Sequence, residues 1–280
     1  HIHGPFGDGL IGGRIKKKYK KPLIVTTHGE DVTKYLKKAF SKILVKFTFK
    51  NSDAIICQSK FLEDEIKKFG IENKKFCIIP MGAKTKYFRL RDKENVRKKL
   101  NLPLDKKIIL FVGHLDPRKD PETLVKAINR IKKDAVCYMV GKGKLKKNLN
   151  EMVSKLNLEN HVKFLGLKSN KDVALYMSAC DLFVLPSLME GLPVVLCEAL
   201  ASGKPVVATA VAGTPELVTK DVGYLVKPKD ERDLAKKIML ALNRRWNTKK
   251  LLKKGKQFGA RESAKKLVHV YKKLIKDNSD

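Results

Sequence analysis

The stretch DLFVLPSLMEGLPVVLCEALASGKPVVAT, residues 181–209, establishes the architecture of this protein. Apolar residues dominate 181–186 and 204–209, and a third apolar run lies between them, bounded by Pro193 and Gly203. Proline suits the first turn of a helix and glycine suits its end, so the middle run is predicted to be helical. A strand, a crossover helix and a second strand form the repeating unit of a parallel sheet.

Glu198 lies inside that apolar helix, with no other charged residue between Pro193 and Gly203. Burying a lone carboxylate costs several kcal/mol or forces it to take up a proton. An ion pair with a lysine is one explanation, but it gives no reason for an otherwise apolar helix. We therefore expect Glu198 to face a ligand whose hydroxyl pair, such as a ribose diol, donates two hydrogen bonds to the carboxylate.

The alternation of strand and helix continues along most of the chain. Short β-branched runs alternate with longer amphipathic runs, which predicts an α/β fold with parallel sheets joined by right-handed crossovers. We expect two doubly wound, Rossmann-like domains. The predicted strands are 22–28, 53–58, 76–80, 107–113, 135–141, 161–166, 181–186, 204–209 and 223–227.

The polar, non-periodic stretch near residues 83–95 predicts a domain boundary. Only three predicted strands precede it, and the chain opens on HIHGPFGDGLIGG, which is typical of the middle of a domain. We expect residues 1–90 to form an N-terminal domain that lacks its front portion, and residues 91–245 to form a C-terminal domain. The basic helical segment 246–280 is expected to pack back across the domain junction.

Composition excludes several classes of protein. The 280 residues are 43% hydrophobic, which is typical of a globular protein. No apolar run approaches the roughly 18 residues that cross a bilayer, and no secretory signal is visible. The five cysteines form no CxxC pair, so neither a zinc site nor a disulfide framework is indicated. Reduced thiols in a cytoplasmic protein are expected.

The formal net charge of +32 comes mainly from lysine. Nucleic acid, anionic lipid headgroups and phosphorylated substrates would all be attracted to such a chain. Lysine without interleaved aromatic residues makes a poor surface for stacking bases, so nucleic acid is not an expected partner. Two interpretations stay open, a solvated lysine-rich surface and attraction to an anionic membrane surface.

Residues that follow the strands of a parallel sheet are the first candidates for ligand binding. Arg118 and Lys119 follow the strand 107–113 and precede a helix. Two cations near a helix N-terminus suit a diphosphate, although ordinary solvated side chains are the alternative. The turn Gly141-Lys142-Gly143 follows the next strand, but it lacks the fingerprints of dinucleotide binders and of P-loops.

The stretch PSLMEGLPVVLCEALASGKPVVAT resembles the signature of retaining glycosyltransferases of family 4, in which two glutamates are separated by seven residues. GHLDPRKD resembles the phosphate-binding loop of that family, MVGKGKLKKNL its second glycine turn, and VTTHGED the loop of its acceptor-side histidine. The resemblance covers nearly the whole chain and implies a GT-B fold. Two departures are His114, where most members have arginine, and the absence of a first glycine-rich loop.

The resemblance implies a role for each matching position. Glu198 would hold the ribose hydroxyls, and Glu190 would contact the transferred sugar and support charge at the reacting carbon. Lys119, helped by Arg118, would hold the diphosphate, and His28 would border the sugar and the acceptor. The implied catalytic residues are His28 and Glu190. The implied donor-binding residues are Gly113, Arg118, Lys119, Gly141, Leu167, Lys168, Glu190, Gly191, Leu192, Pro193, Val194, Val195 and Glu198.

The expected activity is transfer of a sugar from a nucleotide-diphosphate sugar to a glycan or lipid-linked acceptor, with retention of anomeric configuration. No cofactor or metal is expected, because fixed cations and helix amides can stabilise the leaving diphosphate. The chain also has no apolar-flanked DxD motif. The expected location is cytoplasmic, with peripheral attachment to the inner face of the membrane left open. A non-catalytic binder of nucleotide sugars and a GT-B nucleotide-sugar epimerase are the alternatives.

Overall fold

The computed structural model describes residues 1–280 except 30–31, 33–38, 72–74, 134 and 278–280. The chain divides into two compact units, each built on a parallel sheet, as the sequence predicted. Among the described residues, no helix is both long and apolar enough to cross a membrane. The first unit comprises His1–Gly82, Glu190–Leu192 and Ala260–Asp280, and the second comprises Ala83–Met189 and Pro193–Gly259.

The first unit contains a four-stranded parallel sheet in the order β1-β2-β3-β4. The prediction of three strands was wrong, because β1 has only two residues and is too short to show a pattern. The strands are β1 (Ile2–His3), β2 (Ile24–Thr26), β3 (Ala54–Cys57) and β4 (Lys75–Ile78), and the helices are α1 (Asp8–Tyr19), α3 (Ala39–Asn51), α4 (Lys60–Lys67) and α13 (Ala260–Lys276).

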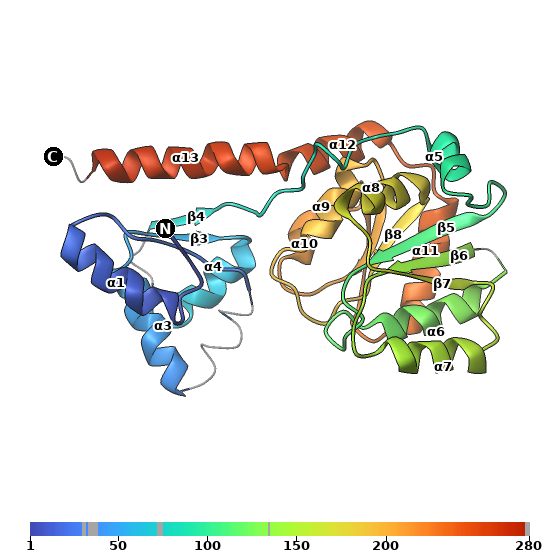
Figure 1. Ribbon diagram of the computed structural model, residues 1–280, viewed down its shortest axis with the longest axis horizontal. Helices are drawn as coiled ribbons and strands as arrows, with labels where there is room; N and C mark the ends of the chain where they lie inside the picture. Colours follow the sequence, from blue (N-terminus) through green and yellow to red (C-terminus); the bar gives the residue numbers. More distant parts are fainter. Residues whose placement is uncertain (30–31, 33–38, 72–74, 134, 278–280) are drawn as a thin grey trace. The chain divides into compact units, whose positions relative to one another are not determined.

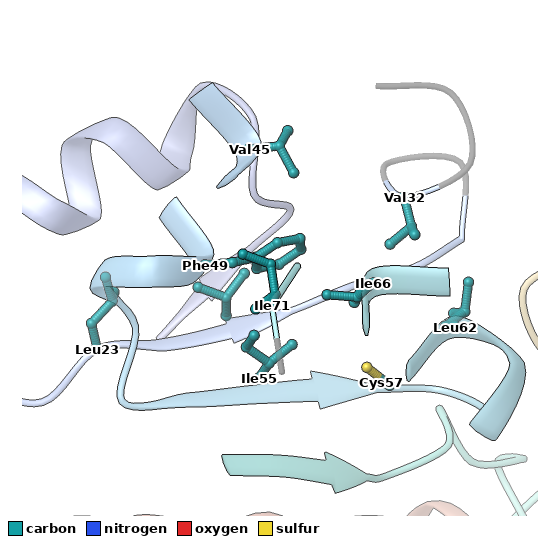
Figure 2. Close-up of a cluster of buried hydrophobic side chains, with 10 residues drawn as sticks. Leu23, Val32, Val45, Phe49, Ile55, Cys57, Leu62, Ile66 and Ile71 are labelled. Carbon is teal, nitrogen blue, oxygen red and sulfur yellow. The ribbon is translucent and has the colours of Figure 1, made fainter. Parts of the chain in front are cut away.

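Two apolar clusters hold this unit together. In the larger cluster, Phe49 of α3 and Ile66 of α4 belong to the same buried group as Ile55 of β3 (Figure 2). In the smaller cluster, Val270 and Leu274 of α13 are buried together with residues of β2 and β3. A helix from the end of the chain therefore completes the core of a unit that begins at the first residue (Figure 1).

The second unit contains a six-stranded parallel sheet in the order β10-β9-β8-β5-β6-β7. Helices α6, α7 and α11 cover one face, and α5, α8, α9 and α12 cover the other (Figure 1). The strands are β5 (Lys107–Val112), β6 (Ala135–Val140), β7 (Val162–Gly166), β8 (Leu182–Leu185), β9 (Val206–Thr209) and β10 (Gly223–Val226). The helices are α5 (Lys93–Lys99), α6 (Pro121–Ile131), α7 (Lys146–Lys155), α8 (Asn170–Ala179), α9 (Val194–Ala201), α10 (Thr214–Leu217), α11 (Glu231–Asn243) and α12 (Thr248–Gln257).

Local sequence signals place the helices that border the candidate site. Helix α6 begins with Pro121 directly after Asp120, and the Asp120 carboxylate accepts a hydrogen bond from the Thr123 hydroxyl at 2.7 Å. Helix α9 begins one residue later than predicted, because Pro193 is its N-cap and lies outside the first turn. Gly203, with φ of 72°, follows the end of α9 and leads the chain into β9.

Candidate active site

The strand order of the second unit places a candidate site at the carboxyl ends of β5 and β8. These strands are neighbours, and the chain order reverses between them, which is where open parallel sheets bind ligands. The loops after the strands are joined by backbone hydrogen bonds. Leu188 N donates to Arg118 O at 2.7 Å, Leu115 N to Lys142 O at 2.9 Å, and Gly141 N to the last residue of β7 at 2.9 Å.

This loop cluster brings together most of the predicted donor-binding residues of the second unit. The cluster also includes the segment after β7, where Leu167 is 61% exposed. Six of the predicted donor-binding residues follow β5, β6 or β7, namely Gly113, Arg118, Lys119, Gly141, Leu167 and Lys168.

The turn after β6 requires its glycines. Gly141 has φ of 144°, and a Cβ atom there would lie 1.9 Å from Gly113 O. A Cβ atom on Gly143 would lie 2.3 Å from Leu115 O. A side chain at either position would force the loops after β5 and β6 apart, so this turn sets the spacing of the candidate phosphate-binding loop.

Asp116 organises the loop after β5. Its carboxylate accepts a hydrogen bond from the Arg118 guanidinium at 2.9 Å and from the backbone N–H groups of Arg118 and Lys119. Burial raises the pKa of Asp116, but these hydrogen bonds together outweigh burial and hold the pKa below its usual value. Asp116 therefore fixes the backbone positions of Arg118 and Lys119, the two candidates for contact with a diphosphate.

The first turn of α9 supplies backbone donors at the same edge of the sheet. The N–H groups of Val194 and Val195 have no acceptor within the helix, because the first turn of any helix lacks one. Pro193 makes no side-chain cap, and both valines are partly exposed. The positive end of the helix dipole adds to these donors, so an anion is stabilised here.

Glu198 lies one turn further along α9. Its side chain is partly buried, and within the described part of the chain its carboxylate makes no hydrogen bond or ion pair. Burial raises the pKa of Glu198 to about 7, although the charge of Lys84 opposes this shift. The alternative explanation, a lysine ion pair, is thus not found among the described residues.

His28 lies in the first unit, just beyond Thr27 at the end of β2, within a cluster of polar side chains. The Gln58 side-chain amide contacts His28 Nδ1 at 2.6 Å, and His28 Nε2 contacts His3 Nδ1 at 3.1 Å. With the Gln58 nitrogen as donor, His28 carries its proton on Nε2 and donates it to His3. The rings of His28 and His3 are stacked with centroids 5.2 Å apart, and His1 stacks on His3 at 4.7 Å.

The structure does not place all predicted residues in one unit. Glu190, Gly191 and Leu192 are grouped with the first unit, as is His28, whereas Glu198 belongs to the second unit. Each unit therefore carries part of the predicted catalytic and donor-binding set, and the set as a whole is not assembled within either unit.

Sequence reasoning assigned no role to three polar residues of the second unit. Lys84 acts electrostatically on Glu198, but it lies in a charged stretch that gives no signal of this role. The hydroxyls of Ser187 and Thr214 are buried and, among the described residues, have no hydrogen-bond partner. Ser187 was recognised from the sequence only as a matching position of the family signature, and Thr214, which begins α10 after β9, was not named. Among the residues that the structure describes, no three or more His, Cys, Asp or Glu side chains are grouped so that they could hold a metal ion.

Comparison with known proteins identifies the family. The family model of group 1 glycosyl transferases matches residues 92–258, and the model of glycosyltransferase family 4 matches residues 1–87. An uncharacterized glycosyltransferase of Methanocaldococcus jannaschii is 33% identical over 281 residues, which cover 100% of this chain and 75% of that protein. This chain therefore belongs to the group 1 glycosyl transferases.

Two further proteins are similar to this chain. The N-acetylgalactosamine-N,N'-diacetylbacillosaminyl-diphospho-undecaprenol 4-alpha-N-acetylgalactosaminyltransferase of Campylobacter jejuni is 34% identical, over 71% of this chain and 54% of that protein. The solved structure of Anabaena HepE in complex with UDP has a TM-score of 0.84 at 21% identity, covering 95% of this chain and 76% of that chain. The two parallel sheets are those of the GT-B fold, as predicted.

Proposed function

We propose that this glycosyltransferase moves a sugar from a nucleotide-diphosphate sugar to a glycan or lipid-linked acceptor, with retention of anomeric configuration and without a metal ion. The observation that carries the proposal is the Glu198 carboxylate, which is partly buried and makes no hydrogen bond or ion pair among the described residues. Its pKa of about 7 shows that its environment does not stabilise the charged form. A ribose diol would donate two hydrogen bonds to the carboxylate and so stabilise that form.

The diphosphate of the donor would lie between the loop after β5 and the first turn of α9. Lys119 supplies a cation, and the amides of Val194 and Val195 supply hydrogen bonds and the positive end of the helix dipole. Support for a nucleoside diphosphate comes from the GT-B neighbour solved with UDP. The base would lie against Leu167 and Lys168, mainly through backbone contacts.

In the proposed reaction, the bond between the anomeric carbon and the diphosphate oxygen breaks, with both electrons passing to the leaving oxygen. Lys119 and the helix amides stabilise the developing negative charge. The acceptor hydroxyl oxygen bonds to the anomeric carbon on the same face, and its proton passes to an oxygen of the departing diphosphate. Glu190 supports the positive charge on the sugar ring, and His28 positions the sugar and the acceptor hydroxyl.

A lipid-linked acceptor would place the protein at the inner face of a membrane. The relative from Campylobacter jejuni is named for transfer to a diphospho-undecaprenol-linked acceptor. The net charge of +32 favours an anionic membrane surface as a further partner. Peripheral association of this kind needs no membrane-spanning helix.

The proposal is tested first by thermal shift with uridine and guanosine diphosphates and their sugars, and then by transfer assays. A nucleoside diphosphate that raises the melting temperature in the wild type, and not in Glu198→Gln, supports the ribose role. Nuclear magnetic resonance of the product should show the anomeric configuration of the donor, and activity should survive chelation. An inverted product, or activity abolished by EDTA and restored by a divalent cation, would refute the mechanism.

A further inference from the structure

Helix α3 carries an exposed apolar ridge on the side opposite its buried face. Val45 and Phe49 are fully buried in the core of the first unit. On the other side, Phe40, Ile43 and Phe47 follow the helical spacing i, i+3, i+7 and are 75%, 67% and 50% exposed. Three large apolar side chains aligned toward solvent are more than the isolated exposed residues normal for a soluble surface.

A basic groove of about 760 Å³ runs beside this ridge, between α1 and α3. Arg14, Lys17 and Lys21 line it together with Phe47 of the ridge. The helices approach closely because α1 has a glycine at the crossing, where a Cβ atom on Gly9 would lie 2.2 Å from the Thr48 hydroxyl oxygen. The groove therefore places cations directly along one flank of the apolar ridge.

The charges around the ridge are almost all positive. Residues 8–21 and 39–51 contain nine basic residues and one acidic residue, Asp8. Lys16 donates to Asp53 at 2.7 Å and is thereby engaged. In the described part of the chain, no ion pair involves Arg14, Lys17, Lys21, Lys46 or Lys50. These cations are free to meet an anionic surface.

We propose that this face, the α1–α3 face, docks the protein on an anionic lipid bilayer. Phe40, Ile43 and Phe47 enter the boundary between headgroups and acyl chains, and the basic side chains contact lipid phosphates. A soluble phosphate would use the cations and leave the ridge in water, whereas a bilayer stabilises both. The proposal gives a surface to the membrane association proposed above, and it does not depend on transfer activity.

The test is co-sedimentation with vesicles of phosphatidylcholine, with and without about 30% phosphatidylglycerol. The wild type should bind the anionic vesicles and be released by salt. Arg14→Glu/Lys17→Glu/Lys21→Glu should weaken binding at least about 100-fold, because each basic residue lost from the surface removes a factor of about five and each glutamate adds repulsion. Phe40→Ser/Phe47→Ser should weaken binding at least about tenfold at unchanged charge.

Matched controls come from the second unit. The exposed lysines of α12 allow Lys249→Glu/Lys253→Glu/Lys256→Glu, which changes the net charge by the same amount. Leu104→Ser/Leu240→Ser removes two other exposed apolar side chains. Both control variants should bind anionic vesicles as the wild type does. All variants should keep the wild-type melting profile and the thermal shift with nucleoside diphosphate, so a failure of the donor proposal would appear separately.

Three outcomes would overturn the docking proposal. The first is that the wild type fails to bind anionic vesicles, and the second is that the α12 charge variant loses as much binding as the α1 variant. The third outcome is a concentration-dependent dimer in sedimentation velocity that Phe40→Ser/Phe47→Ser dissolves, which would assign the ridge to a second copy of the chain.

Discussion

Replacing Glu198 with glutamine should stabilise the free protein and abolish nucleotide binding, two effects of opposite sign. The pKa of Glu198 is raised from 4.5 to about 7 in the folded protein, so the fold disfavours the charged carboxylate. The stability contributed by the protonated form is fully present below pH 4.5 and is lost as the pH rises through about 7. Glutamine is uncharged at every pH and avoids this loss.

The magnitude follows from the size of the shift. A pKa shift of this size lowers the free energy of unfolding by about 3 kcal/mol at pH 8 and by about 1 kcal/mol at pH 5. Chemical denaturation should therefore show Glu198→Gln gaining about 2 kcal/mol more at pH 8 than at pH 5. The exposed Glu151 of α7 allows the matched variant Glu151→Gln, which should show no such pH-dependent gain.

Ligand binding completes this prediction. The ionised Glu198 accepts both ribose hydrogen bonds, so the affinity of the wild type for a nucleoside diphosphate should rise as the pH passes from 6 through about 7. Isothermal titration in buffers of different ionisation enthalpy should detect the released proton. A variant that is less stable than the wild type at pH 8, or that binds the nucleotide normally, would contradict the role assigned to Glu198.

Two further variants test other parts of the site. Lys119→Met should weaken binding of a nucleoside diphosphate about 10- to 100-fold while leaving the free nucleoside unaffected, and the exposed Lys126→Met on α6 should change neither in the same titrations. Gly141→Ala should lower the free energy of unfolding by about 3 kcal/mol, because its Cβ would lie 1.9 Å from Gly113 O at φ of 144°; wild-type stability in denaturant would show that the loops do not approach as closely as described.

The α/β architecture was predictable because its buried strands are apolar enough to be recognised one by one. All nine predicted strands are present, within two residues at each end. Strand β1 was not predicted, since Ile2 and His3 have too few neighbours to show alternation. Its position in the sheet depends on hydrogen bonds to β2, which is a tertiary effect that no local pattern contains.

The candidate site was predictable where the chemistry of a residue conflicts with its surroundings. Glu198 stands out because a carboxylate in an apolar helix demands an explanation, and the structure shows it partly buried with a raised pKa. Lys84 could not be found in this way, because a lysine in a polar stretch of a lysine-rich chain does not conflict with its surroundings. The hydrogen bond from Arg118 to Asp116 could not be predicted from the sequence either, because it depends on how the loop folds back on itself.

The packing of α13 has a consequence for biosynthesis. The apolar side of β2 and β3 is closed by Val270 and Leu274, which the ribosome adds only after the whole of the second unit has been made. During translation, Ile24 and Ile56 of the first unit must therefore stay uncovered while residues 83–259 are synthesised. The second unit can complete its core while the first unit still lacks its closing helix, α13.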